Sequence, residues 1–272
     1  MISYAGRRLL FGSLLAGFCA ALVLADALGR LAFARTATWT GWSLYAICIF
    51  LALYNLRKKA LVVLGLGSSA LWLQTHVYFG LFSIVLFLVH VGWRWPNGIL
   101  EATLALVFTL VAGSGVLGLF LSRSFPSRLA RRGQEVLFER IPRLRRQLAD
   151  QASELVLASV ETGGARTLPD FYAKQLARYF AGPRSFWLHL LGSNWPRRRL
   201  LADLQALERF LNKEELEALR RLDELVGLKD DLDFHYALQA TLKRWLFVHI
   251  PLTYGLLAVG LVHGCWAQWY VR

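Results

Sequence analysis

The sequence predicts an all-α integral membrane protein, a five-span helix bundle with one helical insertion. More than half of the 272 residues, 56%, are hydrophobic. Several apolar runs approach about 20 residues, the length that a helix needs to cross a hydrocarbon core of about 30 Å. One long polar stretch with apolar residues at helical spacing precedes the last of these runs, and no strand pattern competes with the helical one.

These observations divide the chain into three predicted parts. Membrane helices one to four occupy 1–121, a cytoplasmic helical insertion occupies 122–241, and a fifth membrane helix occupies 242–272, with its most apolar part at 245–266. The insertion is the only part in which charged residues are frequent enough to exclude a position inside the membrane.

The first two spans are predicted at 9–28 and 39–56. A pair of arginines precedes the first apolar run, which is also typical of a cleavable signal peptide, but we interpret the run as an uncleaved first span. A basic turn at 57–59 follows the second span. Residues 60–71 are apolar but too short to span, so we expect an interfacial or partly buried segment there.

The third span is predicted at 72–93, where the sequence WRWPNG begins a turn, and the fourth at 99–121. Gly113, Gly115 and Gly118 of the fourth span would let a macrocycle or a neighbouring helix approach closely. Plain helix packing is the more common reason for such spacing.

The insertion is predicted to be helical. Leucines recur at helical spacing over 201–211 and again, ending in a valine, over 216–226, which predicts an antiparallel helical pair. Asn212 followed by Glu215 resembles a capping box between the two helices. The insertion also holds charges of both signs, including Arg197, Arg198, Arg199, Asp230, Asp231 and Asp233. We interpret these charges as solvated helix faces, and a docking surface for a soluble redox partner or a second copy of the chain is the alternative.

Basic residues near the ends of the spans predict the orientation. One side has Arg7, Arg8, Arg57, Lys58, Lys59, Arg123, Arg128, Lys243 and Arg244, and the other has Arg30, Arg35, Arg94 and Arg272. The richer side should be cytoplasmic, which places the N-terminus and the insertion inside and the C-terminus outside, in the inner membrane if the chain is bacterial. Contact with anionic membrane lipid explains the net charge of +13, so we expect no nucleic-acid partner.

Two histidine pairs stand out within the spans. His76 and His90 in the third span, and His249 and His263 in the fifth, both read H-x13-H. Fourteen residues of helix rise about 21 Å and end roughly 40° short of whole turns, so each pair shares one helix face. A single histidine in a span is often a packed polar residue, but four at matched depths favour ligation of two six-coordinate haems.

The same topology predicts how the histidines pair. Because the third and fifth spans leave the cytoplasm in the same direction, we expect His76 to meet His249 near the inner face. His90 would meet His263 near the outer face. The only methionine is Met1, no C-x-x-C-H is present and the cysteines form no cluster, so covalent haem and iron–sulfur centres are excluded.

The paired H-x13-H helices resemble the membrane dihaem cytochromes b. This group includes cytochrome b of the quinol-oxidising complexes, the ferric reductase and NADPH oxidase membrane domain, and the cytochrome b subunits that anchor bacterial dehydrogenases and hydrogenases. The resemblance covers 72–93 and 242–266 with the helix between them. It implies two haem b groups, a quinone or quinol partner, and a role as the membrane cytochrome subunit of an oxidoreductase complex. The compact members usually have no insertion at this point.

Further residues are candidates for the same sites. Gly80 leaves room for a porphyrin, and Arg94, Lys243 and Arg244 could neutralise haem propionates, although snorkelling of basic flank residues explains each of them equally well. Glu101 could accept a proton at a quinone site, and a water-facing acid at a helix end is the alternative.

Two histidines lie in the insertion. His235 precedes His249 by fourteen residues and so continues the spacing, but the equivalent position on the third span is Val62, which leaves a third haem without a partner ligand. His189 could replace that ligand only if the fold brought it near. We expect both histidines to be exposed or locally bonded.

The sequence therefore favours transmembrane electron transfer through two b-type haems, linking a quinone pool to a peripheral redox protein or another cytochrome. One alternative is a reductase of an external acceptor, such as ferric iron or oxygen, that is fed by a separate cytoplasmic flavoprotein. The other is a haem-free transporter or assembly factor, although no inverted repeat supports transport. No nucleotide or flavin motif is present.

Overall fold

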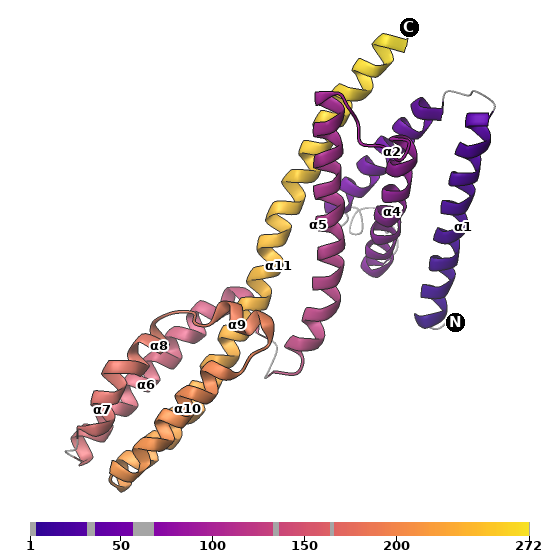
Figure 1. The fold of residues 1–272 in the computed structure, drawn as a ribbon. Helices are drawn as coiled ribbons and strands as arrows, with labels where there is room; N and C mark the ends of the chain where they lie inside the picture. Colours follow the sequence, from indigo (N-terminus) through magenta and orange to yellow (C-terminus); the bar gives the residue numbers. More distant parts are fainter. Residues whose placement is uncertain (1–3, 32–35, 57–67, 133–135, 164–165, 272) are drawn as a thin grey trace. The chain divides into compact units, whose positions relative to one another are not determined.

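The computed structural model describes residues 4–31, 36–56, 68–132, 136–163 and 166–271. The described residues are mainly helical and contain no strand, and five of their helices are long and apolar enough to cross a membrane (Figure 1). The prediction of an all-α integral membrane protein with five spans is confirmed to this extent. Which membrane the chain occupies, and in which orientation, stays a prediction.

The chain divides into two compact units. We call Met1–Phe120 together with Trp245–Arg272 the apolar unit, and Leu121–Arg244 the polar unit. The two long helices α5 and α11 contribute residues to both. The assignment of the polar unit to the cytoplasm rests on charge counting alone.

The apolar unit is built from five helices. These are α1 (Tyr4–Leu31), α2 (Thr36–Ala52) with the short η1 (Leu53–Leu56), α4 (Ser69–His90), most of α5 (Ile99–Leu129) and the C-terminal part of α11 (Lys213–Val271). Within this unit α4 packs beside both α1 and α2 (Figure 1). Its core contains Leu44, Cys48, Leu86, Phe108 and Leu256. Many other large apolar side chains face outward, for example Phe247 with 81% of its surface exposed, as expected for helices in contact with lipid.

Helix α4 carries the first histidine pair and has well-defined ends. It begins after Ser68, whose hydroxyl accepts a hydrogen bond from the backbone N–H of Leu71 at 3.3 Å. The helix ends at His90, where Gly92 and Trp93 take positive φ values of 67° and 61° and turn the chain. Of the predicted segment 60–71, residues 60–67 lie outside the described residues and the rest belongs to this helix start.

Two helices continue across the predicted boundaries between the parts of the chain. Helix α5 continues past residue 121 to Leu129, with Pro126 inside it, and α11 runs without a break through the predicted boundary at 241/242. The change from polar to apolar composition is real, but composition does not end a helix. No proline or helix cap lies between Asn212 and Pro251 to interrupt the backbone hydrogen bonds.

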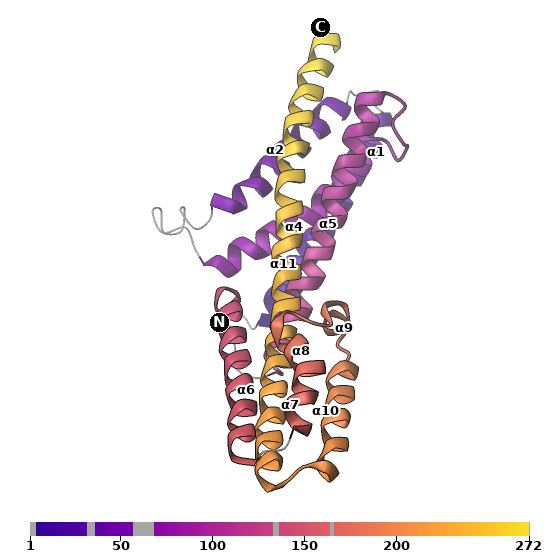
Figure 2. The same ribbon diagram turned by 90° about the vertical axis from the view of Figure 1, so that its left-hand side faces the viewer.

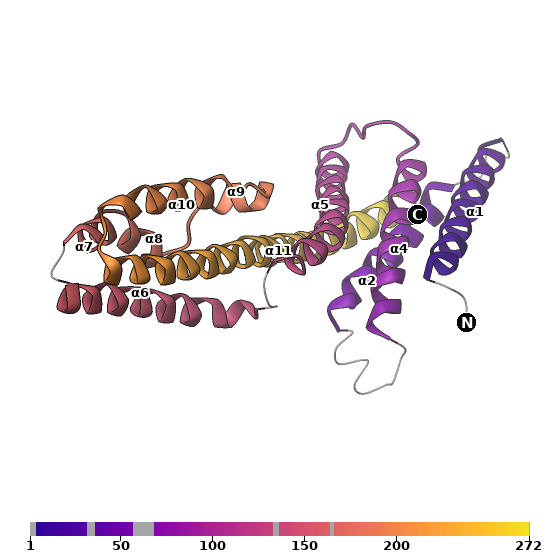
Figure 3. The same cartoon turned by 90° about the horizontal axis from the view of Figure 1, so that it is seen from below.

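The polar unit is a group of helices around the N-terminal part of α11. It contains α6 (Ile141–Gly163), α7 (Thr167–Phe171), a π-helical turn (Tyr172–Leu176), α8 (Ala177–Ala181), α9 (Phe186–Leu191) and α10 (Trp195–Leu207). Figures 2 and 3 show α6 and α10 alongside this part of α11. Leucines of α10 and α11, including Leu204, Leu219 and Leu222, share one buried core, which confirms the predicted helical pair.

The predicted capping box at the start of α11 is also confirmed. The Asn212 Oδ1 atom accepts a hydrogen bond from the Glu215 backbone N–H at 2.8 Å, and the Glu215 carboxylate accepts one from the Asn212 N–H at 3.3 Å. Glu215 is completely buried and its other carboxylate oxygen accepts from the Leu168 N–H at 3.4 Å. The cap therefore also joins α7 to α11.

The prediction that the charges of the insertion form solvated faces is wrong for its central part. Lys229, Asp230 and Asp233 are each at most 2% exposed. Lys229 donates a hydrogen bond to Asp233, and Arg132 pairs with Asp230 at 3.1 Å. A helix face with this many charged residues has the same sequence pattern whether it faces solvent or is covered by neighbouring helices. Only the packing of the helices distinguishes the two cases.

Burial dominates the electrostatics of this buried cluster. It raises the pKa of Asp230 and of Asp233 and lowers the pKa of Lys229, while the neighbouring opposite charges act against each shift. Lys229 also lies over the ring of Tyr179 at 3.9 Å, and the backbone N–H of Arg184 donates to Asp233 at 3.0 Å. A single substitution of Lys229 or Asp233 would therefore leave a buried polar group without the partner that it has now.

Removal of one partner of the buried pair should destabilise the polar unit strongly. We expect Lys229→Met to lower the free energy of unfolding by about 3–5 kcal/mol, because it removes the cation that hydrogen-bonds the buried Asp233 carboxylate and leaves only the more distant Arg145, at 4.0 Å, to balance its charge. Lys229→Met combined with Asp233→Asn should cost less than the sum of the two single changes. The stability of the two single variants and of the double variant is measured by thermal unfolding of the purified chain, with limited proteolysis as the probe of unfolding.

The matched control is the exposed pair Arg221–Glu217, whose atoms lie 2.9 Å apart on the same helix with side chains 64% and 70% exposed. Arg221→Ala should cost less than about 0.5 kcal/mol. An equal loss of stability in Lys229→Met and Arg221→Ala would contradict a structural role for the buried cluster.

Candidate functional site

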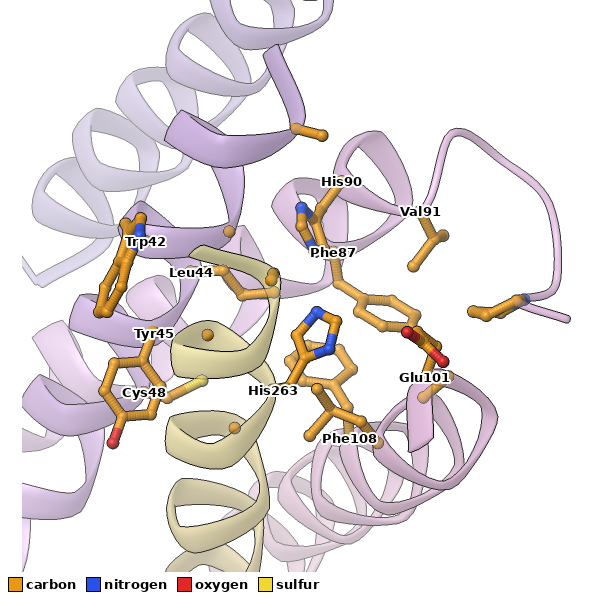
Figure 4. Close-up of a pocket in the computed structure, with 18 of the residues that line it drawn as sticks. Trp42, Leu44, Tyr45, Cys48, Phe87, His90, Val91, Glu101, Phe108 and His263 are labelled. Carbon is orange, nitrogen blue, oxygen red and sulfur yellow. The ribbon is translucent and has the colours of Figure 1, made fainter. Parts of the chain in front are cut away.

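The apolar unit contains a cavity of about 540 Å³ between α2, α4, α5 and α11. This volume lies within the usual range for pockets that bind small molecules or cofactors. Its walls are mainly apolar and include Leu44, Tyr45, Phe87, Leu104 and Phe108, and Figure 4 shows the imidazoles of His90 and His263 beside it. The structure therefore brings together the two histidines that were predicted to pair near the outer face.

His90 is oriented by the first turns of α2. Its Nδ1 atom lies 3.1 Å from the Thr40 hydroxyl oxygen, and that hydroxyl is also 3.0 Å from the Thr36 carbonyl and 3.1 Å from the Ala37 carbonyl. A hydroxyl has a single proton, and Thr40 donates it to these backbone carbonyls. The Thr40 oxygen can therefore only accept a hydrogen bond from the His90 Nδ1–H. In this neutral tautomer the lone pair of Nε2 is available to a metal ion.

Gly41 allows the close approach of α2 to His90. A Cβ atom at this position would lie 2.8 Å from the His90 Cε1 atom, closer than real side chains come. Any larger residue would push the imidazole out of its present position. Thr40 and Gly41 together therefore fix both the tautomer and the place of the ring.

His263 comes from α11, which α2 also holds in place. The Tyr45 hydroxyl donates a hydrogen bond to the Leu257 carbonyl at 3.2 Å, and the Trp42 indole N–H donates to the Gln268 side chain at 3.0 Å. Within the part of the chain that the structure describes, the buried Nδ1 atom of His263 has no hydrogen-bond partner. The buried Nδ1 atoms of His189 and His235 share this feature, so it does not by itself mark His263 as a ligand.

The structure does not place the other predicted pair around this cavity. The His76 ring lies 4.6 Å from the ring of Tyr54. His249 stacks on Trp245 with ring centroids 5.3 Å apart, and its Nδ1 atom lies 3.0 Å from the Ser114 hydroxyl. The pairing of His76 with His249 stays a prediction from the sequence.

Trp245 explains one of the glycines on α5. Its indole ring lies directly against Gly118, where a Cβ atom would overlap it, and its N–H donates a hydrogen bond to the Ser114 carbonyl at 2.8 Å. Gly115 approaches His249, with 3.8 Å between a Cβ atom placed there and the His249 Cε1 atom. Helix packing, the more common reason for such glycines, accounts for Gly118.

Two predicted polar residues lie at the same cavity as His90 and His263. Arg94, in the turn after α4, is exposed and lines the cavity. Glu101, in the first turn of α5, is half-buried and also lines it, and Figure 4 shows its carboxylate at the edge of the same pocket. Its side chain folds back over Gly98, and the N-terminal end of a helix favours a negative charge.

The remaining candidates have other surroundings. A Cβ atom on Gly80 would meet nothing within 4 Å, so this glycine faces open space. Lys243 pairs with Glu139 at 2.6 Å, and the guanidinium of Arg244 lies 5.0 Å from the centre of the Phe186 ring. Both basic residues thus have partners inside the polar unit, and a role for them at haem propionates stays a prediction.

The two histidines of the polar unit are buried, so the alternative that they are exposed is wrong and local bonding is confirmed. The His235 Nε2 atom lies 2.8 Å from the Arg132 carbonyl. The His189 Nε2 atom lies 3.6 Å from the Asp230 carboxylate, and burial lowers the pKa of His189. Both rings contribute to the packing of the polar unit around Phe234.

Among the described residues no three histidine, cysteine, aspartate or glutamate side chains group as metal ligands, but a bis-histidine site needs only two. No family model, curated protein or solved structure matches the chain. The argument for function therefore depends on the histidines and on the cavity that two of them share.

Proposed function

We propose that the chain is a membrane cytochrome b that transfers electrons across the membrane, between a quinone pool and a redox partner protein. In this proposal His90 and His263 ligate one haem b, and His76 and His249 ligate a second. The observation that carries the proposal is the shared cavity of about 540 Å³ beside His90 and His263. These two histidines end equally spaced pairs on the third and fifth spans, which the predicted topology makes parallel.

The residues around the cavity fit a haem. Thr40 leaves the Nε2 lone pair of His90 free for iron, and His263 lines the same cavity. Aromatic and aliphatic side chains surround the space, and Arg94 supplies a positive charge at its edge. Bound haem would supply one-electron redox chemistry, and two histidine ligands would leave no position open for oxygen.

The second haem rests on the sequence pattern and on one contact. His76 and His249 each precede the outer histidine of their helix by fourteen residues. The Ser114 hydroxyl lies at hydrogen-bond distance from the His249 Nδ1 atom, just as Thr40 does from the Nδ1 atom of His90. An acceptor at Nδ1 would again leave Nε2 as the ligand atom.

Glu101 is the residue that could serve quinone chemistry. Oxidation of a quinol releases protons, and a carboxylate within the same cavity can accept one. On the predicted orientation this cavity faces the outer side of the membrane.

Loss of individual histidines should remove the haems one at a time. We expect His90→Ala and His263→Ala each to lower the haem content from about two per chain to about one, because a bis-histidine iron needs both ligands. His76→Ala and His249→Ala should remove the other haem. Haem is quantified after extraction from the purified chain.

The control for this series is His235→Gln, which keeps a donor to the Arg132 carbonyl at a histidine outside the proposed sites. It should retain both haems. An unchanged haem content in His90→Ala would overturn the assignment of the outer ligands, while a loss in His235→Gln would indicate a general effect on folding.

The Thr40 hydroxyl should change the midpoint potential of the outer haem, although it is not a ligand of the iron. We expect Thr40→Val to keep both haems and to raise one of the two midpoint potentials by about 60 mV, which corresponds to a tenfold effect for one electron. The reason is that loss of the hydrogen bond at Nδ1 makes His90 a weaker donor to oxidised iron. Potentiometric titration separates the two haems.

Thr109→Val is the matched control, because the hydrogen bond that the Thr109 hydroxyl makes among the described residues is to the Ala105 carbonyl of its own helix, at 2.7 Å. Neither midpoint potential should change in this variant. Equal shifts in Thr40→Val and Thr109→Val would exclude a specific link between Thr40 and the outer site.

Glu101→Gln tests the quinone part of the proposal. We expect quinol-driven haem reduction to slow by about 100-fold or more, because an amide cannot take the proton. Reduction by dithionite, which needs no proton acceptor in the protein, should be unchanged and serves as the internal control. A normal rate with quinol would remove Glu101 from the mechanism and leave the haem assignment intact.

A further inference from the structure

The polar unit exposes large apolar side chains on one short helix. In α9, Trp187 is 72% exposed and Leu191 is 82% exposed, although both belong to residue types that folded proteins usually cover. They are four residues apart and therefore lie on one helix face, while His189 between them is buried on the other side. Trp195, at the start of α10, is also 54% exposed.

Helix α9 is held firmly in this position. Its C-terminal end is closed by Gly192 at a φ of 80°, whose N–H donates to the His189 carbonyl at 3.0 Å. The Arg128 guanidinium donates to the same carbonyl at 2.9 Å. At the other end, the Phe186 ring lies 5.0 Å from the guanidinium of Arg244. The outward direction of the apolar face is therefore a fixed feature of the polar unit.

The residues that hold α9 are close in sequence to the membrane spans. Arg244 immediately precedes the apolar run of the fifth span. Arg128 follows the predicted end of the fourth span by seven residues, which is about 10 Å of helix. Because α5 and α11 continue as helices through these positions, α9 is attached to the part of the polar unit where the chain enters the membrane.

The charged residues of the chain segment that contains α9 are all positive, and the acidic neighbours Asp230 and Asp233 are buried. The segment 184–199 contains four arginines and no aspartate or glutamate. Arg184, Arg198 and Arg199 are exposed, and Arg199 lies over the ring of Trp195 at 5.4 Å. Tryptophan is enriched at the level of lipid headgroups, and each arginine near an anionic leaflet contributes attraction. A second copy of the chain that paired through this same face would bring the same positive charge and would be repelled.

We propose that α9 and the start of α10 dock on the anionic surface of the membrane that the chain spans. Trp187 and Leu191 enter the boundary between headgroups and acyl chains, and the neighbouring arginines bind acidic headgroups. The polar unit is thereby attached to the membrane by its own surface as well as by α5 and α11. This inference does not depend on haem, and it fails or holds independently of the proposed function.

The test measures immersion depth in the full-length chain. Cys19, Cys48 and Cys265 are replaced by serine, and a nitroxide is attached to a single cysteine introduced by Leu191→Cys or, independently, Trp187→Cys. The control label is at Phe210→Cys, because Phe210 is 64% exposed but lies beside the start of α11, about 46 Å of helix away from Arg244. Each nanodisc holds one chain and a mixture of zwitterionic and anionic lipid.

We expect labels at 191 and 187 to be accessible to oxygen and protected from a water-soluble nickel chelate, and the label at 210 to show the opposite. Arg198→Gln with Arg199→Gln should lower the ratio of docked to undocked chains by about 30-fold at low salt. Equal nickel accessibility at 191, 187 and 210 would overturn the proposal. Protection that appears only with two chains per disc would also overturn it, in favour of an interface between copies.

Discussion

The candidate site depends on the packing of α2 against the two helices that carry histidines. Thr40 and Gly41 hold the His90 ring from one side, and Tyr45 bonds the backbone of α11 near His263. In a membrane the helices gain little from hydrophobic burial against one another, so hydrogen bonds and close packing determine their spacing. Without these contacts neither imidazole would have a fixed direction, and the cavity between the helices would have no defined shape.

The polar unit is stabilised differently. Its core is apolar in the ordinary way, but Lys229, Asp230 and Asp233 of α11 are buried among the surrounding helices. Asp230 pairs with Arg132, and Asp233 accepts hydrogen bonds from Lys229 and from the Arg184 backbone N–H. A buried ion pair adds little stability compared with an apolar pair of the same size, but it specifies which surfaces fit together. The result is a unit in which the position of α9 and the burial of His189 and His235 are fixed.

The sequence could predict features that depend on local pattern. Apolar runs identify the five helices, and the spacing of Asn212 and Glu215 identifies a cap. The spacing of the histidines predicted that His90 and His263 lie together, since helical period and topology are sufficient for this. The sequence could not predict the burial of Asp230 and Asp233, the continuity of α11, or the role of Thr40. Each of these depends on residues that are distant in the chain, as Thr40 is from His90, and a periodic pattern contains no information about them.

The central claim is that the histidines of α4 and α11 bind two haems. The most direct measurement is the absorption spectrum of the purified full-length chain, oxidised and then reduced with dithionite, with haem quantified per chain. The account predicts a low-spin b-type spectrum and about two haems per chain. A chain without haem, purified from cells that supply it to other cytochromes, would contradict the account and favour a transporter or an assembly factor.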